Sequence, residues 1–96
     1  MRNQNDSSLG DIIRQLTEEY RLKDKLDQVS VQRIWESALG TAISRNTKEV
    51  TFKKGALKVR IASASLRQEL EIRKTEIIAK LNEELGSELV KEISFC

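Results

Sequence analysis

The spacing of the apolar residues changes twice along this chain, and that change limits its fold more than any other feature. From Leu9 to Ala42 apolar residues return every three or four positions, as on one face of an α-helix. Around Val50 the spacing becomes two, which is typical of a strand with one buried face. From Leu66 to Leu85 the helical spacing returns. Helices on both sides of a strand segment predict an α+β domain.

Two helices are predicted before the strands. Ser8 is a suitable N-cap for the first, with Asp11 three positions later. Its apolar face comprises Leu9, Ile12, Ile13, Leu16 and Tyr20. The polar stretch 22–26 predicts a tight connection. The second helix runs from about Asp27 to Leu39, with Gly40 placed as a glycine cap and a further helical turn over 41–45.

A β-hairpin, a long helix and a last strand are predicted to follow. Runs ending at Phe52 and Ile61 alternate apolar with polar residues around a Lys54-Gly55 turn. Residues 65–68 fit a capping box for a helix that Gly86 ends, and 88–95 alternate as a third strand. The expected order is α-α-β-β-α-β in a single two-layer α+β domain over residues 8–96, after a short disordered arm over 1–7. The pattern leaves open which hairpin strand the last strand pairs with.

The core expected from these patterns includes all four aromatic side chains, Tyr20, Trp35, Phe52 and Phe95. The residues singled out as structural core are Trp35, Gly40, Ile34, Val59, Leu70, Ile93 and Phe95.

Composition excludes most kinds of chemistry. The chain has 96 residues, no histidine and a single cysteine, Cys96, so neither a disulfide framework nor a thiolate metal site is expected. Its four glycines are far apart, which excludes the glycine-rich loops that hold nucleotide phosphates. No apolar run approaches the length of a membrane span. We therefore expect a cytoplasmic, non-enzymatic binding protein with no cofactor, metal, membrane contact or small-molecule substrate.

Positive charge is concentrated in one segment of a chain whose net charge is only +2. Between Arg45 and Arg60 six basic residues face one acid, Glu49, which gives +5 and leaves −3 for the rest. Strand alternation puts Lys53, Lys58 and Arg60 on one side of the hairpin, with Lys54 at its turn. This pattern indicates phosphate binding, and equally a hairpin edge kept soluble by lysines. Without exposed aromatics, any nucleic-acid binding should be electrostatic and poor in sequence preference.

An ordered series of short patterns resembles the bacterial DciA family over roughly residues 8–95. The series consists of Ile34-Trp35 with Gly40 and Ile43 following, Gly55-Ala56-Leu57-Lys58-Val59, Ser63-Ala64-Ser65, Gln68-Glu69-Leu70, Leu81-Asn82, Leu85-Gly86 and Ile93-Ser94-Phe95.

The resemblance implies a DNA-replication accessory. Members of this family contact the replicative hexameric helicase and assist its loading on single-stranded DNA, and their folded domain is similar to a type II KH domain. The G-x-x-G loop of KH domains is absent here. The resemblance therefore implies weak, non-specific contacts to single-stranded DNA from basic side chains, namely Lys53, Lys54, Lys58 and Arg60 of the hairpin together with Arg67, Arg73 and Lys74.

Two other functions are compatible with the same residues. One is an RNA-binding KH-like module of the ribosome-assembly type, which would use the same basic surface. The other is a protein–protein adaptor whose charges only keep it soluble, and which would bind no nucleic acid even at low salt.

Overall fold

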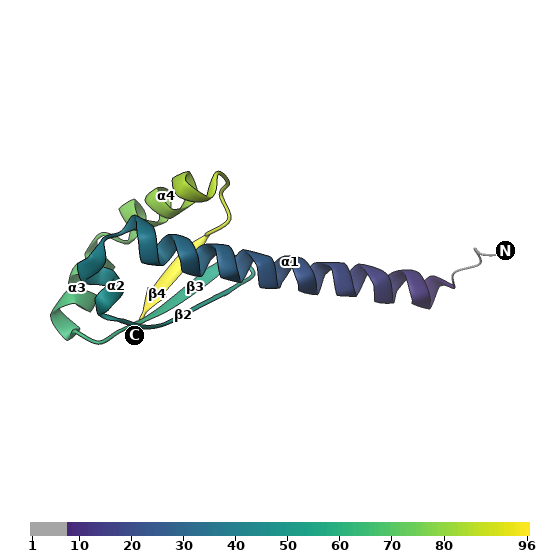
Figure 1. Cartoon of the computed structure of the whole chain (residues 1–96), viewed down its shortest axis with the longest axis horizontal. Helices are drawn as coiled ribbons and strands as arrows, with labels where there is room; N and C mark the ends of the chain where they lie inside the picture. The colour runs from purple at the N-terminus through teal and green to yellow at the C-terminus, as the bar shows by residue number, and fades with distance from the viewer. Residues whose placement is uncertain (1–7) are drawn as a thin grey trace.

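The computed structural model describes residues 8–96, and the predicted arm over residues 1–7 lies outside the described part. In chain order the elements are α1 (Leu9–Ala38), α2 (Thr41–Arg45), β2 (Thr47–Lys53), β3 (Ala56–Ile61), α3 (Ala64–Ile72), α4 (Lys74–Leu85) and β4 (Glu92–Phe95). This confirms the α+β class and the order α-α-β-β-α-β, with the third helical segment divided in two. The molecule is elongated, 62 × 23 × 19 Å, because one half of α1 extends beyond the sheet (Figure 1).

The sheet has three strands in the order β2-β3-β4. β2 and β3 are antiparallel, with Phe52 opposite Leu57, whereas β4 runs parallel to β3, with Ile93 opposite Leu57. The last strand thus pairs with the second strand of the hairpin. The hairpin turn is Lys54-Gly55, where both φ angles are positive (49° and 84°), as a two-residue turn of type I′ requires. A Cβ at Gly55 would lie 2.9 Å from Cγ of Lys91, so glycine also allows β4 to approach.

α1 is a single helix of 30 residues, so the connection predicted over 22–26 was wrong. Ser8 caps the helix as predicted, with its Oγ accepting from the backbone N–H of Asp11. The polar stretch contains neither glycine nor proline, and its lysines are good helix formers. An ion pair of 2.8 Å between Lys23 and Asp27, one helical turn apart, supports the continuous helix.

The continuous helix leaves its N-terminal apolar residues without a core to cover. Burial was predicted for this face, but the exposed fractions of its residues are high: Leu9 74%, Ile12 46%, Ile13 54%, Leu16 47% and Tyr20 68%. Lys23 and Asp27 lie beside the turn of the β2–β3 hairpin. Residues before Lys23 therefore extend past the end of the sheet (Figure 1). Amphipathic spacing correctly indicated the helix, but not whether anything packs against it.

The long helix predicted after the hairpin is interrupted at Arg73, which adopts φ −98° and ψ 18° between α3 and α4. No glycine or proline marks this break in the sequence. The N-cap of α3 is Ser63 rather than Ser65, and its Oγ accepts from the backbone N–H of Leu66 at 3.2 Å. Gly86 ends α4 in the left-handed conformation, as predicted.

The core lies between the sheet and the helices α1, α3 and α4. Its buried side chains are Val31, Trp35, Phe52, Leu57, Val59, Ile61, Leu70, Ile77, Leu81, Val90 and Ile93. Ile34 and Phe95 are partly buried and pack against this cluster. Gly40 is exposed and follows the C-cap of α1 with a φ of 99°, which favours glycine. Val90 was not expected inside. Its backbone N–H and C=O both bond to the side-chain amide of Asn82, at 2.9 Å each.

Trp35 connects the two layers of the domain. Its side chain is fully buried, and its indole N–H donates to Oγ1 of Thr47 at 2.9 Å. The Thr47 hydroxyl in turn donates to the carbonyl of Ile43 at 2.7 Å. The indole ring lies 6.1 Å from the ring of Phe95 on β4. One side chain of α1 thus contacts β2 and β4, which are the two edges of the sheet.

Replacing Trp35 with alanine should lower the free energy of unfolding by about 3–5 kcal/mol, because a large buried side chain is lost and a cavity remains. Trp35→Phe should cost less, because it keeps an aromatic ring in the core and loses the indole donor. Urea unfolding should be followed by circular dichroism, since Trp35 is the only tryptophan. A loss below about 1 kcal/mol for Trp35→Ala would contradict the anchoring role.

Candidate nucleic-acid interface

The hairpin presents basic side chains on the side of the sheet that faces away from the core. The register places Lys58 opposite Thr51, Arg60 opposite Glu49 and Lys53 opposite Ala56. Lys53, Lys58 and Arg60 are all exposed, whereas the alternating residues of β3, Leu57, Val59 and Ile61, are buried. We call the side that carries Lys53, Lys58 and Arg60 the outer face of the sheet.

Carboxylates lie among the basic side chains of the outer face. Arg60 forms an ion pair of 3.6 Å with Glu49 across the strands. Glu92, which is remote in sequence, lies beside Ala56 on this face because β4 pairs with β3. Among residues 8–96, no ion pair joins Lys53, Lys54 or Lys58 to a carboxylate. The same holds for Lys48 on β2, so within the described residues Arg60 is the hairpin cation whose charge is balanced by a close carboxylate.

An open pocket of about 560 Å³ lies between α4 and β4, which forms one edge of the sheet. Its basic residues are Lys58 from β3, Lys74 from α4 and Lys91 from the segment before β4. The partly buried Ile78 contributes apolar surface, the buried Ile93 lies beneath it, and Glu92 contributes one carboxylate. We call this pocket the β4 groove. It brings together two predicted site residues, Lys58 and Lys74, that are 16 positions apart in the sequence.

All three predicted basic residues of the helices have local partners. Arg67 is half-buried, and its guanidinium donates to the carbonyl of Ile61 at 3.0 Å, which fastens α3 to the end of β3. Arg73 lies 3.7 Å from Glu69, and Lys74 contacts Glu71. Of Arg67, Arg73 and Lys74, only Lys74 lines the β4 groove. Arg67 therefore has a structural contact that its charge and spacing did not reveal.

The tip of the hairpin lies beside α1. A small pocket there is lined by Lys53 and Lys54 from the hairpin and by Lys23, Asp24 and Asp27 from the helix. The hydrogen bond and the negative charge of Asp27 raise the pKa of Lys23 above its ordinary value. α1 thus adds one lysine and two carboxylates to the surroundings of the tip, which is mixed in charge rather than purely basic.

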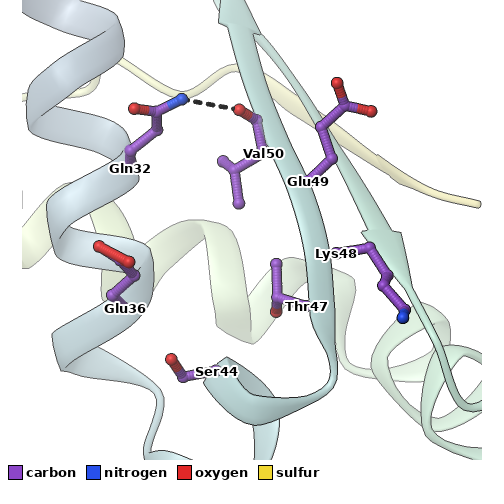
Figure 2. Close-up of a pocket in the computed structure, with 7 residues that line it drawn as sticks. All are labelled: Gln32, Glu36, Ser44, Thr47, Lys48, Glu49 and Val50. Carbon is purple, nitrogen blue, oxygen red and sulfur yellow. Dashed lines mark hydrogen bonds between the residues drawn. The ribbon is translucent and has the colours of Figure 1, made fainter.

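Two glutamines of α1 form hydrogen bonds with the free edge of β2, the edge that does not pair with β3. The sequence analysis did not predict these bonds. The side-chain amide of Gln32 donates to the carbonyl of Val50 at 2.9 Å, and the side-chain oxygen of Gln28 accepts from the N–H of Phe52 at 3.4 Å. Figure 2 shows Gln32 at the pocket of about 210 Å³ between α1 and β2, with Lys48 and Glu49 turned away from Glu36. The available signal was a pair of glutamines one helical turn apart. Their bonds occupy an edge at which another strand could otherwise pair.

Other kinds of site are not found in the described part of the chain. No group of three or more histidine, cysteine, aspartate or glutamate side chains in residues 8–96 could hold a metal ion. No helix within these residues is long and apolar enough to cross a membrane. The thiol of Cys96 is exposed and lies 3.8 Å from the carbonyl of Val59.

Comparison with known proteins identifies the family. A family model described as "Dna[CI] antecedent, DciA" matches residues 8–95. No curated protein matches the chain. The matched range covers the exposed half of α1, the basic hairpin and the β4 groove, so the surfaces described above all lie within it. The chain belongs to the DciA family.

Proposed function

We propose that this protein is a non-enzymatic accessory of the replicative hexameric helicase, which it contacts and helps to load on single-stranded DNA. Membership of the DciA family supports the role in replication. The observation that carries the DNA part is the placement of Lys58 and Lys74 in one groove, next to a face that also presents Lys53. Amines spaced along a groove neutralise successive phosphates of the DNA backbone. This electrostatic contribution dominates the affinity of non-specific DNA binding.

The β4 groove suits a single strand better than a duplex. The partly buried Ile78 offers some apolar surface to unpaired bases. Lys58 and Lys91 can contact phosphates directly, and Lys74 can do so by exchanging its contact with Glu71 for a phosphate. A duplex keeps its bases stacked inside and could use only the charges. The sheet face carries no aromatic platform on which bases could stack, so binding should be weak and insensitive to sequence.

We infer that the junction between α3 and α4 contacts the nucleic-acid backbone, as the corresponding loop of KH domains does, although it contains no glycine. KH domains clamp the nucleic-acid backbone with a G-x-x-G loop. Here the junction holds Arg73 and Lys74 instead of glycines, and Lys74 reaches the β4 groove. Contact through a side-chain amine supplies charge but not the close approach of backbone N–H groups, which again favours weak binding.

A triple variant tests the contribution of the hairpin. Lys53→Gln, Lys54→Gln and Lys58→Gln together should reduce the salt slope of single-stranded DNA binding by about 2, because each lost phosphate contact is worth about 0.7 for a single strand. The measurement is fluorescence anisotropy of a labelled oligothymidine over a series of salt concentrations.

The matched control removes three charges from the exposed part of α1, with Arg14→Gln, Arg21→Gln and Lys25→Gln. This control has the same net charge as the hairpin variant and should keep most of the slope. An equal loss of slope in both variants would show that only net charge matters, which contradicts a defined footprint.

A second pair of variants separates binding from folding. Lys58→Gln with Lys74→Gln should weaken DNA binding several-fold without lowering the free energy of unfolding, since both side chains line an open groove. Arg67→Gln should instead lower that free energy by about 1.5 kcal/mol, because a charge-assisted hydrogen bond to Ile61 is lost. DNA titration and urea unfolding of both variants check this, and a reversed pattern would assign the DNA contact to Arg67.

The helicase contact is tested directly by a pull-down of the purified protein against the replicative helicase of the same organism, with and without single-stranded DNA. Reproducible binding is expected in at least one condition. A competition between single-stranded DNA, duplex DNA and structured RNA accompanies it. Absence of helicase binding together with a preference for structured RNA would replace this function with the RNA-binding alternative.

A further inference from the structure

The half of α1 that extends past the sheet carries a row of apolar side chains that the functions above leave unused. Leu9, Ile12, Ile13, Leu16 and Tyr20 follow one another at helical spacing and are all about half exposed or more. We call these five residues the α1 stripe. Its length, from Leu9 to Tyr20, is about three turns of helix. The largest exposed apolar patch of a monomeric protein is typically about 300–600 Å² and is often functional.

The charges around the stripe indicate a protein as its occupant. Between Leu9 and Lys23 there are three acids (Asp11, Glu18 and Glu19) and three bases (Arg14, Arg21 and Lys23), so this part of the helix is neutral. Helices that bind anionic lipid surfaces or nucleic acid carry an excess of lysine and arginine on their polar face. A neutral polar face beside an apolar stripe instead suits an apolar protein surface that is surrounded by side chains of both charges.

A second copy of this chain would bury too little area through the stripe alone. A large apolar side chain presents about 60–120 Å² of apolar surface, so the exposed fractions of the five side chains amount to roughly 300 Å². Stable protein pairs bury about 800 Å² on each partner, of which about 450–500 Å² is apolar. Two stripes pairing along one seam therefore fall short of a stable dimer. A partner that encloses the helix in a groove buries its flanks as well.

Further apolar side chains on α1 also favour an enclosing partner. Leu22, Leu26 and Val29 are about half exposed and lie on a different side of the helix from the stripe. A flat surface could not cover both rows, whereas a groove that wraps the helix reaches them in succession. Helix-in-groove recognition uses anchors at this spacing of three, four and seven residues.

We propose that the α1 stripe is the surface through which this protein docks on the replicative helicase, by entering an apolar, helix-binding groove of that partner. This assignment rests on the proposed function. It separates the two binding surfaces, with DNA at the β4 groove and the helicase on the free half of α1.

The test is a double variant, Ile13→Ser with Leu16→Ser, measured against the helicase by biolayer interferometry. Helicase binding should weaken at least tenfold, while oligothymidine affinity and the thermal unfolding midpoint stay unchanged because neither side chain lies in the core. The matched control is Arg14→Ser with Glu18→Ser, which alters the polar face of the same turns. It should bind the helicase within about twofold of the unchanged protein, since exposed charges of this kind contribute little.

The possible outcomes distinguish a failure of the proposed function from a failure of the docking assignment alone. If the unchanged protein does not bind the helicase, the proposed function fails and the docking assignment falls with it. If the unchanged protein binds and the stripe variant binds equally well, only the docking assignment is overturned. A dimer that the stripe variant abolishes in light scattering, with helicase binding intact, would assign the stripe to a second copy. A selective loss of DNA affinity would assign it to nucleic acid.

Discussion

The position of α1 on the sheet depends on the buried indole of Trp35. The ring reaches from the helix to both edges of the sheet, through its hydrogen bond to Thr47 near the start of β2 and its contact with Phe95 on β4. Gln28 and Gln32 add bonds from the same helix to the free edge of β2. Since these contacts hold the C-terminal half of α1 in a fixed direction, they also determine where the N-terminal half projects.

Much of this fold was predictable because local spacing decides it. The hairpin turn at Lys54-Gly55, the serine cap at Ser8 and the glycine at the end of α4 each follow from local backbone chemistry. The joining of two predicted helices into α1 was not predictable in the same way, since a charged stretch is compatible with either helix or loop. Whether Tyr20 is buried depends on how far the sheet extends beneath the helix, and that is a tertiary quantity.

The candidate site was likewise predictable where it depends on local spacing, and not where it depends on contacts between elements. Alternation along β3 placed Lys58 and Arg60 on one face, and the structure has them there. Spacing could not reveal that Arg60 pairs with Glu49, that Glu92 arrives on the same face, or that Arg67 fastens α3 to β3. Each of these depends on a partner from another element. The β4 groove exists only because β4 pairs with β3 and α4 lies beside it.

The length of α1 has a mechanical consequence. Trp35 and Leu9 are 26 residues apart in one unbroken helix, which is about 39 Å at the usual rise per residue. Because Gln28 and Gln32 hold the helix along the edge of the sheet, the free arm is the part before Lys23, about 21 Å long. A tilt of about 5° where the helix leaves the sheet displaces Leu9 by roughly 2 Å. A load applied to the tip would be transmitted through the unbroken helix to the contacts of Gln28, Gln32 and Trp35 with the sheet.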